Sequence, residues 1–402
     1  MELICAVQNY DWGKYGRDSI VASLIKTSNP NFVINEEKPY AELWMGTHVN
    51  GPSYLMEKNI SLEKYIEENT NVLGSEVEQI FQSSLPFLFK VLSVRKALSI
   101  QVHPDKKKAE ELHLFDPTIY KDSNHKPELM IALTEFETLC GFRPIEEIKK
   151  YLELLPELRA LIGDDLVHEF MITNDSEYRE PLKKCFRSLM MCEHNLVIEQ
   201  LKHLLERLSH LDISSQQLLN ADLLRKLDSY FPGDIGCFGI YMFNYITLQP
   251  GEAVYIAPNE PHAYIYGDCI ECMACSDNIV RAGLTPKLKD VKTLTEMLTY
   301  KCEPDFAKKF PGYCEDNCTE IFQPPVPDFA VAKILIPCDK MEYELIPRKS
   351  ASIIIVINGK GKIRSSQIIQ RGTILFVHAN EKLLVKIVEN CSLLMFQAFA
   401  NV

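Results

Sequence analysis

Short apolar runs separated by turn residues occupy the chain before residue 145 and again after residue 234. Residues 87–94 and 98–103 are two such runs, rich in β-branched and aromatic side chains, and this pattern predicts strands. Asn358-Gly359 follows another run and predicts a hairpin turn. The strands predicted after residue 234 are 240–248, 253–257, 331–336, 352–357, 374–377, 383–388 and 393–399. Short strands at this spacing favour a barrel or jelly roll.

Residues 146–233 follow a different pattern, in which leucines recur three or four positions apart, as at Leu201, Leu204 and Leu208. This period predicts amphipathic helices, which end at Phe231-Pro-Gly-Asp234. We interpret the leucines as core residues rather than as a zipper for a partner protein. Because strands precede and follow this stretch, the sequence predicts an all-helical domain inserted into a β domain.

Two segments of the β regions resemble each other. Gln249-Pro-Gly leads into an apolar run and then Asn259-Glu, and Gln370-Arg-Gly leads into an apolar run and then Asn380-Glu. The repetition suggests two copies of one β unit, although two strand-and-turn segments can also coincide by chance. Where the first copy has His262, the second has Leu383, so a metal ligand at His262 would have no counterpart in the second copy.

Length and charge narrow the classes of protein to consider. The 402 residues suffice for two or three domains. A formal charge of -12 argues against nucleic acid or an anionic membrane as the main partner, but a locally basic pocket can still bind an anionic small molecule.

We expect a cytoplasmic protein, because the sequence shows no recognisable signal peptide or membrane span and its cysteines fit no disulfide pattern. The first ten residues lack the features of a signal peptide, and no apolar run approaches the roughly 20 residues of a membrane span. Thirteen cysteines, an odd number scattered along the chain, predict reduced thiols.

Four residues form a candidate metal site. Gln101 and His103 are two positions apart, so on a strand their side chains leave by the same face. Glu128 lies in Asn124-His-Lys-Pro-Glu128, and His262 follows Pro261. Two imidazoles, a carboxylate and an amide oxygen suit zinc, with coordination positions left for substrate. Each residue alone has a plainer explanation, such as a hydrogen-bonded core histidine, a surface carboxylate or a turn histidine.

Two further stretches carry candidate chemistry. Cys269-Ile-Glu-Cys-Met-Ala-Cys275 lacks the fourth cysteine followed by proline that the ferredoxin pattern requires, and Cys269 and Cys272 would lie on opposite faces of a strand, so we predict buried thiols. Arg281 and Lys287 could neutralise a phosphate or an oxyanion, or could be surface cations of a solvated loop.

The sequence closely resembles the type I phosphomannose isomerase family. The resemblance runs from the N-terminus to Lys287, and beyond about residue 300 only the pattern of strands supports it. The matching segments are Tyr10-Asp-Trp-Gly13, Ala41-Glu-Leu-Trp-Met-Gly-Thr-His48, Ser99-Ile-Gln-Val-His-Pro-Asp-Lys106, Asn124-His-Lys-Pro-Glu128, Gly141-Phe-Arg-Pro144, Pro261-His-Ala-Tyr264, Gly267-Asp-Cys269 and Glu271 to Lys287.

The resemblance implies a mainly β fold with two cupin or jelly-roll-like barrels and an inserted helical domain. The expected domains are a catalytic barrel at 1–145 plus 234–300, a helical domain at 146–233, and a C-terminal barrel without metal ligands at 301–402. It also implies one zinc ion per subunit, with the family's metal ligands and active-site arginine falling on Gln101, His103, Glu128, His262 and Arg281.

The activity implied is the reversible conversion of mannose 6-phosphate into fructose 6-phosphate through a cis-enediol(ate), which feeds GDP-mannose synthesis. The sequence leaves Glu271, Lys126 and Asp277 open as the base. Ser99, Lys126 and Lys287 are candidate phosphate contacts, and Tyr264 is expected to line the pocket. We expect a cytoplasmic monomer that binds a phosphorylated sugar and neither nucleic acid nor membrane.

Two other functions fit a cupin scaffold. One is an iron or manganese oxygenase, which uses an open site of histidines and a carboxylate. The other is a non-catalytic sugar-phosphate-binding protein, whose sequence would have lost Arg281 or a metal ligand. Neither loss is seen.

Overall fold

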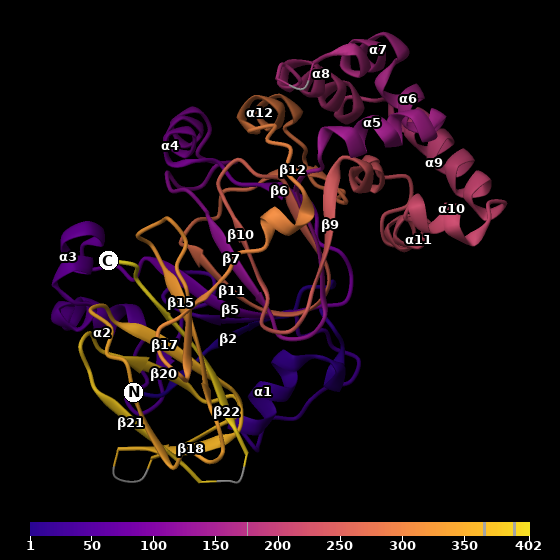
Figure 1. The fold of residues 1–402 in the computed structure, drawn as a ribbon. Coiled ribbons are helices and arrows are strands. Elements are labelled where there is room, and N and C mark those ends of the chain that lie inside the picture. Colours follow the sequence, from indigo (N-terminus) through magenta and orange to yellow (C-terminus); the bar gives the residue numbers. More distant parts are fainter. Residues whose placement is uncertain (175, 365–366, 389–390) are drawn as a thin grey trace.

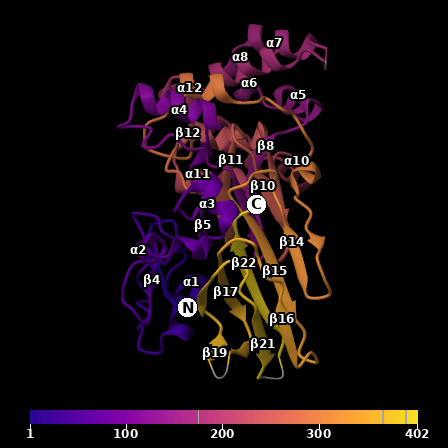
Figure 2. The ribbon, with the colours of Figure 1, turned by 90° about the vertical axis from the view of Figure 1, so that its left-hand side faces the viewer.

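The computed structural model describes residues 1–174, 176–364, 367–388 and 391–402. The fold is mainly β with a helical insertion (Figure 1), as the hydrophobic pattern predicted. Helices α5 to α8 (145–190) lie at one end of the molecule, and the strands from β13 to β22 (313–399) lie at the other. A ten-stranded sheet, called the first sheet below, lies between them (Figures 1 and 2).

Strand β11 organises the first sheet. Its 13 residues pair with β6 and β8 near its start and with β5 and β7 farther along. Gly267 lies where the partners change, with a φ of 118° and no room for a Cβ, which would lie 2.5 Å from Glu135 O. The strands of this sheet are β2 (Ala6–Gln8), β3 (Glu42–Met45), β5 (Phe87–Val94), β6 (Ile100–Val102), β7 (Glu128–Ala132), β8 (Phe136–Phe142), β9 (Phe243–Leu248), β10 (Ala253–Ile256), β11 (His262–Ala274) and β12 (Val280–Gly283).

Short helices and a small sheet flank this first sheet. Ser61 caps α2 by accepting a hydrogen bond from Lys64 N. These elements are β1 (Leu3–Ile4) paired with β4 (Tyr54–Leu55), η1 (Gly16–Asp18), α1 (Ile20–Ser28), α2 (Leu62–Glu68), η2 (Thr70–Leu73), α3 (Ser75–Phe81), α4 (Lys106–Phe115), α12 (Val291–Met297) and η4 (Asp305–Lys308).

The helical insertion lies between β8 and β9, and its leucines form a core. Leu201, Leu204 and Leu208 are buried in one apolar cluster with residues of the first sheet. The helices are α5 (Ile145–Leu154), α6 (Pro156–Ile162), α7 (Asp164–Ile172), α8 (Arg179–Met190), α9 (His194–Ser209), α10 (Ile213–Leu218) and α11 (Ala221–Tyr230). Among the described residues no helix is long and apolar enough to cross a membrane.

The C-terminal strands form two sheets packed face to face. Ile354 and Val356 of one sheet share a core with Tyr343 and Val385 of the other. The six-stranded sheet contains β13 (Tyr313–Cys314), β14 (Thr319–Phe322), β15 (Ala330–Ile336), β17 (Ser352–Asn358), β20 (Ile374–Val377) and β22 (Leu393–Phe399). The four-stranded sheet contains β16 (Glu342–Leu345), β18 (Lys360–Ile363), β19 (Gln367–Gln370) and β21 (Leu383–Ile387).

The six-stranded sheet also packs against the first sheet. Ile353, Ile355 and Phe396 share a core with Phe89 and Ile131. β17 is therefore buried on both faces, which explains why its sequence is continuously apolar rather than alternating.

Three predictions need correction. The described strands form open sheets that pack through side chains, so no closed barrel is seen. Asn358-Gly359 does form a turn, with Gly359 at a φ of 86°, but it links β17 and β18, which belong to different sheets and do not pair. The strand predicted at 240–248 begins only at Phe243, because η3 (Ile235–Tyr241) precedes it.

The two similar segments have the same local structure. In each, a glycine with positive φ (Gly251 and Gly372) precedes a strand, and an asparagine with positive φ (Asn259 and Asn380) follows it. Leu383, the counterpart of His262, is 3% exposed in the core of the C-terminal sandwich.

Candidate metal centre and active site

Three neighbouring strands bring candidate residues side by side. β6 pairs with β11 so that Gln101 lies opposite His262, and with β12 so that Gln101 lies opposite Arg281. Residues directly opposite each other in a ladder project from the same face of the sheet. The chain therefore places Gln101 between a candidate metal ligand and the candidate catalytic arginine, and the Gln101 amide donates to Ser99 Oγ at 3.2 Å.

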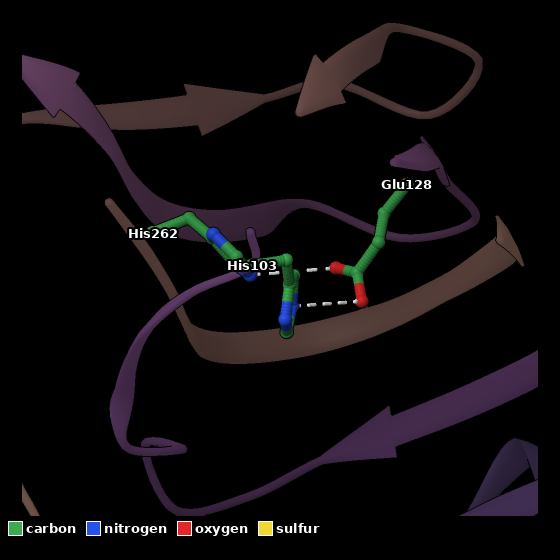
Figure 3. A group of neighbouring side chains, drawn as sticks. All are labelled: His103, Glu128 and His262. Atoms are coloured by element: carbon green, nitrogen blue, oxygen red, sulfur yellow. Dashed lines mark ion pairs between the residues drawn. The ribbon is translucent and has the colours of Figure 1, made fainter. Parts of the chain in front are cut away.

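His103, Glu128 and His262 converge on one point (Figure 3). His103 Nε2 lies 3.2 Å from Glu128 Oε1, and His262 Nε2 lies 3.4 Å from Glu128 Oε2. One nitrogen or oxygen atom from each of the three residues lies within 4.8 Å of the others, and all three side chains are buried. No other such group of histidine, cysteine, aspartate and glutamate was found in the described part of the chain.

The hydrogen bonds of the two imidazoles favour a metal site. His103 Nδ1 lies 2.7 Å from Asn278 O, and His262 Nδ1 lies 3.1 Å from Glu260 O. A carbonyl only accepts, so each Nδ1 carries a proton and each Nε2 is the ring nitrogen that faces Glu128. His103 Nε2 is buried without a hydrogen-bond partner. Two imidazole nitrogens and a carboxylate that face one buried point form a donor set that suits zinc.

The ionisation states also suit metal binding. Burial, and then the charge of Lys126, lower the pKa of His103 to about 4, so this imidazole is neutral at pH 7. Burial alone would raise the pKa of Glu128, but the opposing influences, the charge of Lys126 first, outweigh it and hold that pKa well below its ordinary value. A neutral imidazole and an ionised carboxylate are the forms that bind metals.

The convergence point opens into a cavity of about 440 Å³. A second cavity of about 890 Å³ adjoins it and extends to the helical insertion at Met190 and Tyr230. Apart from His103, which is buried behind the wall, every predicted site residue lines the first cavity: Ser99, Gln101, Lys126, Glu128, His262, Tyr264, Glu271, Asp277, Arg281 and Lys287.

Several of these residues have partners that limit their roles. Lys126 Nζ lies 3.2 Å from Glu128 Oε1, and the Tyr264 hydroxyl donates to Glu128 Oε2 at 3.4 Å. Asp277 lies 3.3 Å from His48, whose hydrogen bond lowers the pKa of Asp277. Arg281 is half-buried, which lowers its pKa, and it makes no ion pair with any residue that the structure describes. An arginine without an acidic partner is available to a substrate anion.

Lys90 and Glu42 belong to the site, although sequence reasoning missed them. Lys90 Nζ lies 2.9 Å from Glu271 and 3.5 Å from Glu42, and the Trp44 indole N–H donates to Glu42. Burial alone would lower the pKa of Lys90, but the two carboxylates outweigh it and raise that pKa. Burial raises the pKa of Glu271. The available signal was a lysine within the otherwise apolar run of 87–94, because charged residues are rarely buried without a partner.

Replacing Lys90 with methionine is expected to destabilise the protein, because it leaves two buried carboxylates without their cation. Removing one partner of a buried ion pair costs about 3–5 kcal/mol. Chemical denaturation measures the loss. Lys349→Met is the control, since Lys349 pairs with Glu76 at the surface, where a pair contributes at most about 1 kcal/mol. Equal losses in the two variants would show that the Lys90 cluster is not a buried ion-pair network.

The cysteine-rich segment of β11 is structural. Cys269 and Cys272 are buried in two different apolar cores, on opposite faces of the strand, and burial raises the pKa of both thiols. All thirteen cysteines are free. The prediction of buried thiols is confirmed for Cys269 and Cys272.

Three family models match the chain. They are "Phosphomannose isomerase type I, catalytic domain" over residues 1–145, "Phosphomannose isomerase type I, helical insertion domain" over residues 161–243, and "Phosphomannose isomerase type I C-terminal" over residues 319–368.

Curated relatives match nearly the whole chain. Mannose-6-phosphate isomerases of Bos taurus and Homo sapiens are each 47% identical over 411 residues, covering 98% of this chain and 97% of theirs. Two solved structures are similar throughout at 29% identity, covering 100% of this chain and 99% of theirs. They are mannose 6-phosphate isomerase bound with zinc and yttrium (TM-score 0.84) and the apo form from Salmonella typhimurium (TM-score 0.83).

Proposed function

The chain belongs to the type I phosphomannose isomerase family, and from this premise we propose that it interconverts mannose 6-phosphate and fructose 6-phosphate with one bound zinc ion. It is an aldose–ketose isomerase of the same kind as its relatives. The observation that carries the metal assignment is the pair of imidazole Nε2 atoms turned towards the Glu128 carboxylate. The relative with bound zinc supports the choice of metal.

His103, Glu128 and His262 would hold the ion, with Gln101 as the fourth ligand. Bound zinc supplies a Lewis acid that polarises substrate oxygens and stabilises their developing negative charge. Lys126 contacts Glu128 Oε1 and the Tyr264 hydroxyl donates to Glu128 Oε2, so the two side chains fix the orientation of the carboxylate. Because Gln101 lies opposite both His262 and Arg281 in the ladders, a substrate bound at this point also lies beside the arginine.

Among the three candidate bases, the directions of the pKa shifts favour Glu271 over Asp277. Isomerisation moves a proton between C1 and C2 of the open-chain sugar through a cis-enediol(ate), and the base needs a pKa near the working pH. Burial raises the pKa of Glu271 towards that range. Asp277 is a weaker base because its pKa is lowered by His48, and Lys126 is held by Glu128.

The cations of the cavity are suited to the anionic parts of the substrate. Arg281 has no acidic partner among the residues that the structure describes and lies beside the proposed metal ligands, so we assign it to the negative charge of the enediolate. Ser99 and Lys287 line both cavities, so they stay candidates for the phosphate group, which would lie where the two cavities meet.

Isomerisation in D2O tests the proton transfer. Mannose 6-phosphate is incubated with the enzyme for many turnovers, and both sugar phosphates are analysed by NMR. We expect deuterium to replace hydrogen at C1 of fructose 6-phosphate and at C2 of recovered mannose 6-phosphate, and Glu271→Gln to slow the exchange while retaining the metal. Turnover without deuterium in either sugar would contradict the enediol(ate) and favour a hydride shift.

We also propose the domain organisation implied by the family: a cupin-type catalytic unit at 1–145 plus 234–300, a helical domain at 146–233, and a cupin-like unit at 301–402. Free cysteines support a cytoplasmic location. A monomeric state and a supply of mannose 6-phosphate for GDP-mannose synthesis complete the proposal. Iron in the purified protein, with oxygen uptake and no sugar-phosphate turnover, would favour the oxygenase instead.

A further inference from the structure

The loop that precedes Glu128 is anchored to the segment between β11 and β12. Asp122 accepts hydrogen bonds from Ser276 Oγ and Asp277 N, both at 2.8 Å, and Asn124 donates to Cys275 O at 2.9 Å. These contacts hold residues 122–124, at the start of the loop. They do not hold residues 125 and 126, which lead through Pro127 to Glu128.

The last part of the loop is anchored by the C-terminal unit. His125 Nε2 lies 3.0 Å from Asp328 Oδ2, and because a carboxylate only accepts, Nε2 carries the proton and donates. The Asp328 side chain is 5% exposed and that of His125 is 18% exposed. Among the described residues, His125 is the only ion-pair partner of Asp328. Asp328 lies two residues before β15, in a unit otherwise remote from the cavity.

Apolar packing also joins the C-terminal unit to the first sheet. Phe89 and Ile131 already pack against Val331 and Phe396 in the core that joins the two sheets. A buried ion pair contributes little net stability compared with apolar packing, because desolvation offsets most of the attraction. The consequence of the pair is therefore local and concerns the position of residue 125.

His125 lies close in the sequence to the residues of the metal centre, so its position affects theirs. Only Lys126 and Pro127 separate His125 from Glu128, and the proline ring fixes the φ angle of Pro127. Pro127 O also accepts a hydrogen bond from Ala274 N at 3.2 Å, which ties this short segment to β11. A shift of His125 therefore acts first on Lys126, whose Nζ lies 3.2 Å from Glu128 Oε1, while the Glu128 backbone is paired opposite Ile256 and Met273.

We propose that Asp328 is a positioning residue for the metal centre: by holding His125, the C-terminal unit fixes the segment from Lys126 to Glu128. This inference rests on the proposed metal site. It gives the C-terminal unit a role in the chemistry beyond covering an apolar face of the first sheet.

The test compares substitutions at Asp328 with a matched control at the same interface. Asp328→Ala removes the acceptor, and Asp328→Asn retains a carbonyl oxygen for His125. The control Tyr65→Phe removes a hydrogen bond of 3.1 Å between Tyr65 in α2 and His378 in the C-terminal unit, far from the cavity. Zinc affinity is measured by competition with a chelator, and hydrogen exchange reports on the amides of residues 121–127.

We expect Asp328→Ala to weaken zinc binding by about 10-fold or more, the lower end of what losing an outer-shell partner of a ligand costs. Amide exchange in 121–127 should accelerate in the same variant, also without metal. Asp328→Asn should restore most of the affinity, and Tyr65→Phe should change neither measurement. If Asp328→Ala does not fold, His125→Gln, which retains a donor, and His125→Ala form the equivalent pair.

Parental zinc affinity and amide protection in Asp328→Ala would overturn the proposal. It would also fail if Tyr65→Phe weakened zinc binding as strongly, because the effect would then be general destabilisation. A parent protein that binds no zinc would instead refute the proposed function, and the exchange of residues 121–127 in the metal-free variants would still decide whether Asp328 positions the loop.

Discussion

Replacing His262 with alanine is expected to abolish both zinc binding and isomerase activity. His262 supplies one of two imidazole nitrogens that face Glu128, and its Nδ1 contact with Glu260 O aligns the ring for that purpose. Losing even an outer-shell partner of a ligand costs about 10–100-fold in metal affinity, so losing the ligand itself should cost at least about 100-fold. Metal content and turnover of the purified variant are the measurements.

His113→Ala is the matched control for this variant. His113 also makes a ring-nitrogen contact with a backbone carbonyl, at 2.7 Å to Tyr120 O, but lies outside the cavity. The control should keep its zinc and its activity. Full zinc occupancy in His262→Ala would refute the ligand assignment.

Replacing Arg281 with alanine is expected to leave zinc bound and to lower kcat by about 10²–10³-fold, the usual effect of removing a group that stabilises a developing oxyanion. Arg281 faces the cavity beside Gln101 but does not contact the three converging ligands in the structure. Zinc analysis and steady-state kinetics on the same preparation separate the two effects.

Arg371→Ala provides the comparison for Arg281→Ala. Burial lowers the pKa of Arg371 as it does that of Arg281, but Arg371 donates to Ile357 O in the C-terminal unit. Its loss should affect stability and leave kcat unchanged. An Arg281→Ala variant with parental kcat would remove Arg281 from the mechanism.

Much of the candidate site was predictable because its signals are local. A glutamine and a histidine two positions apart on a strand, and the motif around Glu128, predict candidate ligands, and the family resemblance joins them into one set. The structure adds what the sequence alone does not contain, namely that β11 pairs with β6 so that His262 lies opposite Gln101. That register depends on strand pairings between residues far apart in the chain.

The errors came from tertiary packing. The apolar residues at the start of the strand predicted at 240–248 belong instead to a 3₁₀ helix at 235–241, where Gly236 packs so closely against Gly283 that a Cβ on Gly283 would lie 2.5 Å from the Gly236 Cα. Asn358-Gly359 has the local features of a hairpin, yet the partners of β17 and β18 are set by the two sheets of the sandwich.

Charged residues that become buried were the hardest part of the site to predict. Lys90 was passed over within an apolar run, although its side chain links Glu42 and Glu271 beneath the cavity. His125 and Asp328 were missed because they are about 200 residues apart, and only the packing of the C-terminal unit against the first sheet brings them together.

Zinc titration of the metal-stripped protein tests the central claim most directly. The purified chain is treated with a chelator, zinc is added in steps, and bound metal and turnover of mannose 6-phosphate are measured on the same samples. The arrangement of His103, Glu128 and His262 predicts that stripped protein is inactive and that activity rises with bound zinc to a plateau at one ion per chain. Full activity without metal, or zinc binding at that ratio without recovered turnover, would contradict the proposed zinc-dependent isomerase.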